Sequence, residues 1–217
     1  HRSLEGMALV FTVATLLAVL VGTVIEILPT LNLHNYVSEE KKTVPYTPLE
    51  LAGRDIYIRE GCYVCHSQMI RKMPSDVLRF GAASTIEESM YDHPFQWGSK
   101  RTGPDLARLG NKYPDLWHFR HMIDPREVVP NSVMPAYKWL LSKNIDYYSL
   151  RKKVSVMKRL GVPYSQQVLK DADRIAEASA KKISDDLIAQ GAPPEVKDTE
   201  IIALIAYLQA LGQKGGK

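Results

Sequence analysis

Hydrophobic positions divide the chain into one long apolar run followed by amphipathic segments. The run covers residues 6–25, which are 20 residues without charge or proline, and a glutamate stands at each end. A helix of this length spans about 30 Å, the thickness of the hydrocarbon core of a bilayer. We therefore expect a transmembrane anchor over residues 1–28 and an extended linker over residues 29–46.

Two other interpretations of the apolar run are a cleaved signal peptide and a buried core helix. Signal peptides have shorter apolar regions and end at a small-residue cleavage site, whereas this run ends at Glu26-Ile27-Leu28-Pro29. No other segment is apolar enough to surround a buried helix of this kind. Both alternatives are less favoured than a retained anchor, whose orientation Arg2 indicates only weakly.

The rest of the chain predicts helices that are separated by glycine and proline. Thr47, Pro48 and Glu50 form a capping box with proline at the first helical position, so a helix should run from there to about Glu60. Gly53 lies inside it, at a cost of about 1 kcal/mol relative to alanine. A close crossing with another helix would explain this glycine, and a tolerated defect is the alternative.

Further helices are predicted at 114–123, 145–160, 166–190 and 199–211. The last of these has apolar residues at helical spacing and is the expected partner of Gly53. No segment alternates convincingly at period two, so we predict an all-α fold with little or no sheet. Residues 47–217 would form the domain that the anchor carries.

Composition and charge limit the classes of protein to which this chain can belong. With 45% hydrophobic and 24% charged residues the chain is globular rather than disordered. A net charge of +4, with acidic residues among the basic ones, does not indicate nucleic-acid binding. The two cysteines exclude a disulfide-stapled scaffold and a four-cysteine zinc site.

The two cysteines form the motif Cys62-Tyr63-Val64-Cys65-His66, which is the attachment motif of c-type haem. Cysteines three residues apart lie about one turn apart, so each can form a thioether with one porphyrin vinyl group, and His66 then becomes the proximal iron ligand. A redox dithiol or half a zinc site are the alternatives, but the βαβ context and a second ligand pair are missing. Because this attachment takes place in the bacterial periplasm, the domain should lie there and the N-terminus in the cytoplasm.

The sixth iron ligand has several candidates, and Met134 is favoured. Pro135 follows it and disfavours helix, which would leave Met134 on an extended loop able to cover a flat ring. A buried core methionine is the alternative. The remaining histidines and methionines outside the motif are His34, His93, His118, His121, Met69, Met73, Met90, Met122 and Met157. Of these, Met69 and Met73 are too close to the motif in sequence, and His118 and Met122 are expected to be packing or surface residues.

The segment Thr102-Gly103-Pro104-Asp105-Leu106 lies between the motif and Met134. A ligating imidazole needs a partner for its second nitrogen, and a carbonyl on a proline-rigidified loop would supply one. Pro104 is the candidate for that role, and an ordinary turn is the default alternative.

Three stretches carry a resemblance to a known family. They are residues 61–71 (GCYVCHSQMIR), 98–106 (GSKRTGPDL) and 131–137 (NSVMPAY). Together they closely resemble the mono-haem cytochrome c subunit of the cbb(3)-type cytochrome c oxidases. The resemblance implies a class I cytochrome c domain on an N-terminal anchor, with a helical insertion at about residues 138–197.

The resemblance also implies a function, an electron-transfer subunit in a proton-pumping haem-copper oxidase that reduces dioxygen to water. Electrons would pass from cytochrome c, directly or through a di-haem cytochrome c subunit, to one covalent haem c. They would continue to the haem b of a polytopic catalytic subunit in the bacterial inner membrane. By the family pattern Arg71 would meet a haem propionate, the loop 98–102 would face the catalytic subunit, and a calcium ion near Ser99 is conceivable.

Three other functions remain open at this point. The haem c subunit of a nitric oxide reductase also combines an anchor with one haem, although it would not need the insertion. A freestanding membrane-anchored shuttle would have no fixed partner. A haem-based sensor would release Met134 and bind a gas at the iron, whereas the electron-transfer readings predict a closed, low-spin iron.

Overall fold

The structure is a computed structural model that describes residues 2–32, 37, 43–98 and 100–214, in two compact units, residues 1–39 and 40–217. The first unit contains a short helix, α1 (Arg2–Glu5), and a long one, α2 (Ala8–Leu31). No residue of α2 is buried, and its mean hydropathy over the most apolar window is 2.6. By length and composition, α2 is able to cross a membrane.

The end of α2 corrects the predicted boundary between anchor and linker. Pro29 was expected in the linker, but α2 continues through it and ends at Leu31. Proline interrupts a helix by removing one N–H donor and crowding the preceding turn. Here only two helical residues follow it, and Asn32 caps the end, because both its backbone N–H and its side chain donate to the carbonyl of Leu28, at 3.2 and 2.9 Å.

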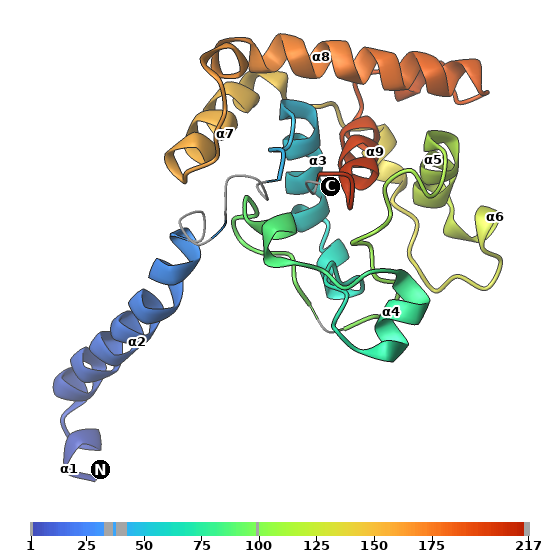
Figure 1. Cartoon of the computed structure of the whole chain (residues 1–217). Coiled ribbons are helices and arrows are strands. Elements are labelled where there is room, and N and C mark those ends of the chain that lie inside the picture. Colours follow the sequence, from blue (N-terminus) through green and yellow to red (C-terminus); the bar gives the residue numbers. More distant parts are fainter. Residues whose placement is uncertain (1, 33–36, 38–42, 99, 215–217) are drawn as a thin grey trace. The chain divides into compact units, whose positions relative to one another are not determined.

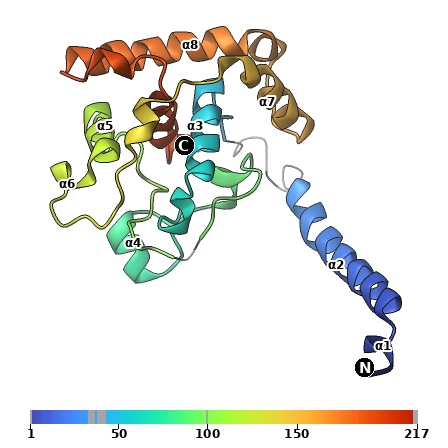
Figure 2. The same cartoon turned by 180° about the vertical axis from the view of Figure 1, so that it is seen from behind.

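The second unit is built around a crossing of α3 (Pro48–Arg59) and α9 (Glu200–Ala210), which lie side by side in Figures 1 and 2. The capping box predicted at Thr47 and Glu50 is present. A Cβ atom on Gly53 would lie 1.9 Å from the carbonyl oxygen of Ala203. The close crossing predicted from Gly53 is therefore confirmed, and only a residue without a side chain fits there.

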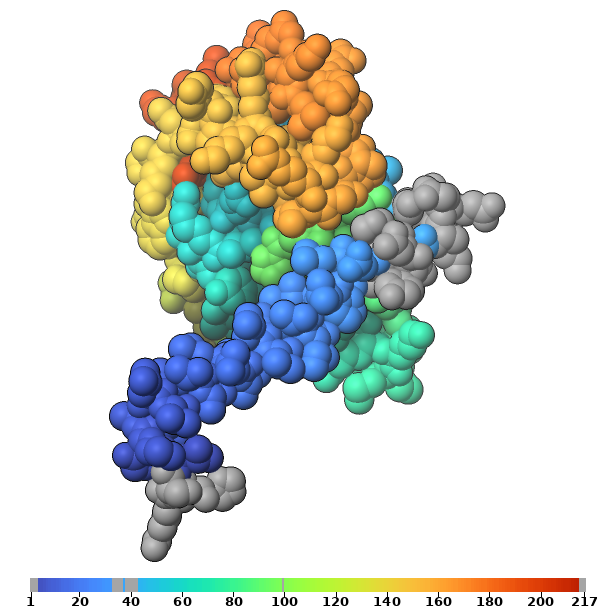
Figure 3. Space-filling view, turned by 90° about the vertical axis from the view of Figure 1, so that its left-hand side faces the viewer, coloured from blue at the N-terminus to red at the C-terminus, as the bar shows by residue number. Residues whose placement is uncertain are grey.

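Two further long helices, α7 (Tyr147–Arg159) and α8 (Gln166–Ala189), lie within the predicted insertion. In Figure 1, α8 runs across the ends of α3 and α9, and in the space-filling view its orange atoms form one end of the domain (Figure 3). The buried stripe of α8 consists of small residues and one leucine: Ala172, Ala176, Ala180, Ser184 and Leu187. Small side chains let this helix approach its neighbours closely.

The remaining elements are short. They are α4 (Pro74–Phe80), α5 (Asp115–Ile123), α6 (Pro125–Val128) and the 3-10 turns η3 (Cys62–Val64), η4 (Ile86–Ser89), η5 (Lys138–Leu141) and η6 (Pro194–Val196). Within the described residues no strand forms, and Asn144 and Thr199 make an isolated bridge. The predicted all-α fold is confirmed, with one N-terminal apolar helix that is able to span a membrane.

Candidate functional site

The Cys62–His66 motif lies on a 3-10 turn that directly follows α3. Gly61 ends the helix in the left-handed conformation, with φ of 71°, which glycine adopts without strain. The backbone N–H groups of Cys65 and His66 then donate to the carbonyl of Cys62, at 3.2 and 3.0 Å. The chain is thereby wound into one tight turn that holds the two cysteines and the histidine together.

Both cysteines are free thiols, and each is partly accessible. Burial raises the pKa of Cys62 to about 12, so this thiol is neutral at physiological pH. Redox dithiols and metal sites require thiolates, which form at lowered pKa. Among the described residues no group of three or more His, Cys, Asp or Glu side chains gathers as a metal site would require. The surroundings of Cys62 therefore favour the uncharged thiol.

The imidazole of His66 is oriented by the segment that contains Pro104. Its Nδ1 lies 2.8 Å from the carbonyl oxygen of Pro104, the partner expected from the sequence. With Nδ1 engaged, Nε2 is the nitrogen available to a metal. Burial lowers the pKa of His66 while the Pro104 carbonyl acts in the opposite direction, so the ring is neutral, as a ligand must be.

Gly103 forms a cradle for the same ring, which the sequence reasoning missed. A Cβ atom at this position would lie 2.3 Å from Cε1 of His66 and 2.8 Å from its Nδ1. The backbone N–H of Gly103 also donates to the carbonyl of Cys65, at 3.0 Å. Sequence alone showed a glycine before a proline, which is the signal of any turn, and only the fold places that turn against the imidazole.

A charged network fixes the loop that carries Gly103 and Pro104. The carboxylate of Asp105 accepts from the hydroxyl of Ser67 at 2.5 Å and from the backbone N–H of Met69 at 3.1 Å. Arg101 donates to the same hydroxyl at 2.7 Å and to the carbonyl of Met69 at 2.9 Å. These contacts join residues 67–69, which follow the motif, to residues 101–105.

Arg71, predicted to meet a haem propionate, is engaged within the chain. Its guanidinium donates to both carboxylate oxygens of Asp76, at 2.8 and 3.0 Å, and Arg101 lies 2.9 Å from the same carboxylate. The two arginines hold the pKa of Asp76 well below its usual range. The propionate role of Arg71 stays a prediction.

The segment after Met134 lies over the motif. The pKa of Tyr137 is raised by burial and by its nearness to Cys62 and Cys65. The indole of Trp139 donates to Glu60, two residues before the motif, at 3.0 Å. Met134 itself is half-buried, and its backbone N–H donates to the hydroxyl of Ser132 at 3.2 Å. The fold therefore brings Tyr137 and Trp139, which follow Met134, close to the motif from more than 70 residues away in sequence.

The residues present fit a covalently attached haem. Two partly accessible free thiols, an imidazole oriented through Nδ1, and a glycine that leaves room for that imidazole suit thioether attachment and axial ligation. His118 and Met122 were expected to be packing or surface residues, and both are buried. Ser99, where a calcium ion was conceivable, and His34 lie outside the described residues.

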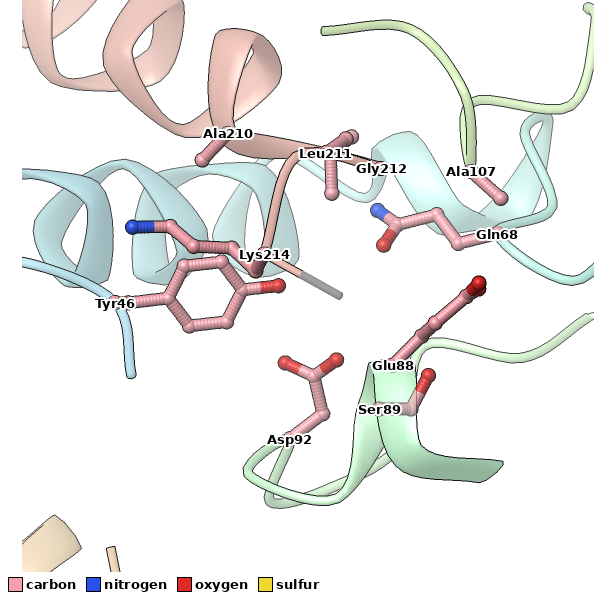
Figure 4. A pocket seen from close by; sticks show the side chains of 10 residues that line it. All are labelled: Tyr46, Gln68, Glu88, Ser89, Asp92, Ala107, Ala210, Leu211, Gly212 and Lys214. Atoms are coloured by element: carbon pink, nitrogen blue, oxygen red, sulfur yellow. The ribbon is translucent and has the colours of Figure 1, made fainter. Parts of the chain in front are cut away.

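A small polar cavity of about 30 Å³ lies between the C-terminal end of α9 and the turn at residues 88–92 (Figure 4). It has the size of one water molecule. In Figure 4 the side chains of Tyr46, Gln68 and Asp92 point toward it. None of its lining residues belongs to the predicted haem site, and it is too small for a cofactor.

Comparison with known proteins gives one family. The family model described as "Cytochrome C oxidase, mono-heme subunit/FixO" matches residues 1–214, almost the whole chain. No curated protein matches the chain.

Proposed function

The chain belongs to the family of mono-haem cytochrome c oxidase subunits, and from this premise we propose that it is the electron-transfer subunit of a cbb(3)-type oxidase. The family implies an electron-transport subunit of a membrane oxidase with one haem. The observation that carries the finer proposal is the bond between His66 Nδ1 and the Pro104 carbonyl, at 2.8 Å, next to two free cysteines. This arrangement suits a covalent haem c with an oriented proximal histidine.

Each residue has a distinct role in the proposal. Cys62 and Cys65 would hold the porphyrin by thioether bonds, and His66 and Met134 would ligate the iron. When bound, the haem would supply a one-electron couple between ferric and ferrous iron. The protein's part would be to hold both ligand side chains in place, so that little rearrangement accompanies each electron.

The proposed setting is the bacterial inner membrane. Helix α2 crosses it once, and the haem domain lies in the periplasm, where thioether attachment takes place. The subunit receives electrons from cytochrome c or a di-haem cytochrome c subunit. It delivers them to the haem b of a polytopic catalytic subunit, which carries copper, reduces dioxygen to water and pumps protons.

The test is purification of this subunit from its native membrane in mild detergent, followed by assays of haem types and oxygen consumption. Co-purification of haem b with oxygen reduction is the expected result. Recovery of haem c without a large partner would replace the proposal with a freestanding shuttle. Haem b with turnover of nitric oxide alone would replace it with a nitric oxide reductase.

Substitution of the sixth ligand tests the haem chemistry separately. Met134→Ala should open the iron, so that ferrous haem binds carbon monoxide. Oxygen consumption with reduced cytochrome c should fall at least tenfold, which corresponds to a rise of about 1.4 kcal/mol in the activation free energy. Met73→Ala is the control, because Met73 is 46% exposed and follows the motif closely. Equal behaviour of the two variants would exclude Met134 as the ligand.

A further inference from the structure

Helix α5 carries two buried imidazole nitrogens without a hydrogen-bond partner, Nε2 of His118 and Nδ1 of His121. A buried polar atom that is left unsatisfied costs about 1–3 kcal/mol. Such atoms are rare in native proteins, and each one calls for a group that satisfies it. His121 is the histidine closer to His66, and its Nδ1 is the atom that needs a partner.

The ring of His121 is held in a fixed orientation by an aromatic stack. Trp117 lies parallel to it, with ring centroids 4.6 Å apart and an angle of 11°. Tyr113 also stacks on Trp117, with ring centroids 4.0 Å apart and an angle of 14° between the ring planes. Three rings spaced four residues apart therefore form one column, in which Tyr113 precedes α5 and Trp117 and His121 belong to it.

The end of α5 that carries His121 is joined to the loop that carries Met134. Burial lowers the pKa of His121, and the nearby ring of His66 lowers it further. The carbonyl of Met122, the next residue, accepts from the backbone N–H of Tyr137 at 2.8 Å. That bond fixes the end of α5 to the loop that carries Met134.

We propose that His121 is a positioning residue of the haem site, whose Nδ1–H donates a hydrogen bond to an acceptor that haem binding brings within reach. Two acceptors share this chemistry, a propionate oxygen of the porphyrin, which arrives with the haem, and the thioether sulfur of Met134, which iron ligation would position. The inference rests on the proposed function, because both acceptors are placed by the haem. Burial keeps the ring neutral, and in the tautomer protonated at Nδ1 the ring is a donor.

The hydrogen bond should shift the equilibrium between ferric and ferrous haem in one direction. A donor to a propionate offsets negative charge near the iron, and a donor to the sulfur withdraws electron density from the ligand. Both favour ferrous over ferric iron. Loss of a bond worth about 1 kcal/mol or less should therefore raise the ratio of ferric to ferrous haem at a fixed applied potential about two- to fivefold.

The experiment compares three variants of the full-length, haem-loaded subunit. His121→Phe keeps the stack on Trp117 and removes the donor, His121→Gln restores an N–H donor, and His118→Phe makes the same change at the other buried imidazole of α5. We expect a lower reduction potential in His121→Phe, recovery of at least half of the change in His121→Gln, and no change in His118→Phe. Equal potentials in wild type and His121→Phe, or equal shifts in all three variants, would overturn the inference.

Resonance Raman spectra of the wild type identify the acceptor and need no variant. Exchange into deuterated water should shift the propionate modes if the acceptor is a carboxylate, or the iron–sulfur mode if it is Met134. A shift in neither set excludes the hydrogen bond, even where His121→Phe does not mature. Absence of covalent haem from the wild type would instead contradict the proposed function, so the two failures are distinguishable.

Discussion

At the scale of single residues, the site depends on how closely backbone can approach the imidazole of His66. Pro104 supplies the carbonyl that orients the ring, and Gly103 supplies the space next to it. Pro104 was identifiable from its chemistry, because a ligating histidine needs an acceptor for its second nitrogen. Gly103 was not, because nothing local distinguishes it from a turn glycine.

Gly103→Ala should displace the imidazole of His66. The added Cβ would lie within 2.3–2.9 Å of three ring atoms, which is closer than non-bonded atoms approach, and the ring is tied to Pro104. We expect less covalent haem per protein, or a ferrous haem that binds carbon monoxide, measured by haem staining and absorption spectra.

Gly98→Ala is the matched control for that prediction. The nearest atom to a Cβ there is the carbonyl oxygen of Tyr63, at 4.0 Å, so the change should be neutral. A Gly103→Ala protein with the haem content and spectrum of the wild type would show that the imidazole does not need this cradle.

At the scale of elements, the crossing of α3 and α9 is the contact that supports the motif. Helix α3 ends at the turn that carries Cys62, and α9 is buried on nearly every side. The pair is further joined by an ion pair between Arg59 and Glu200. Any change in the distance between these helices therefore changes the position of the haem motif.

Gly53→Ala brings two opposing effects into direct competition. Helix propensity alone favours alanine by about 1 kcal/mol. The new Cβ would lie 1.9 Å from the carbonyl oxygen of Ala203, and overpacking of this kind costs about 1–3 kcal/mol or more. Because the contact is with backbone, which cannot rotate away, we expect net destabilisation, seen as a lower thermal unfolding midpoint.

Gly22→Ala in α2 is the control for that substitution, since no atom lies within 4 Å of its would-be Cβ. This variant should leave the unfolding midpoint of the haem domain unchanged. A Gly53→Ala domain that is as stable as the wild type, or more stable, would contradict the close crossing.

At the scale of the whole molecule, the two ends of the helical insertion, residues 143–145 and 198–200, lie side by side. The backbone N–H of Glu200 donates to the carbonyl of Lys143, and that of Ile145 donates to the carbonyl of Asp198, both at 2.8 Å. Between these bonds α7 and α8 fold back on the domain, where Tyr164 donates to the carbonyl of Tyr46 at 2.6 Å. The proposed haem ligands all lie outside this segment.

Replacing residues 145–198 with a two-residue Asn-Gly turn should therefore preserve the haem site but weaken the domain. The bridge between Asn144 and Thr199 gives the ends the antiparallel pairing that such a turn closes. Uncovered apolar surface on α3 and α9 costs about 25 cal/mol per Å². We expect covalent haem with a wild-type spectrum and a lower unfolding midpoint; loss of haem attachment would show that the insertion shapes the site.

The sequence by itself determined what depends on local spacing and periodicity. The 20-residue apolar run predicted the membrane-spanning helix, the capping box predicted the start of α3, and the absence of period-two alternation predicted the all-α fold. The cysteine spacing indicated a haem site for the same reason, because the chemistry needs those atoms one turn apart.

Only the tertiary structure decided contacts between segments that are far apart in the chain. Gly103 against His66, Arg101 with Asp76, and the buried Nδ1 of His121 all depend on how α3, α4, α5 and the loop at 101–106 are packed. Pattern and spacing describe which face of an element is buried. They do not specify which atom of a distant residue meets that face, since this follows from side-chain packing in three dimensions.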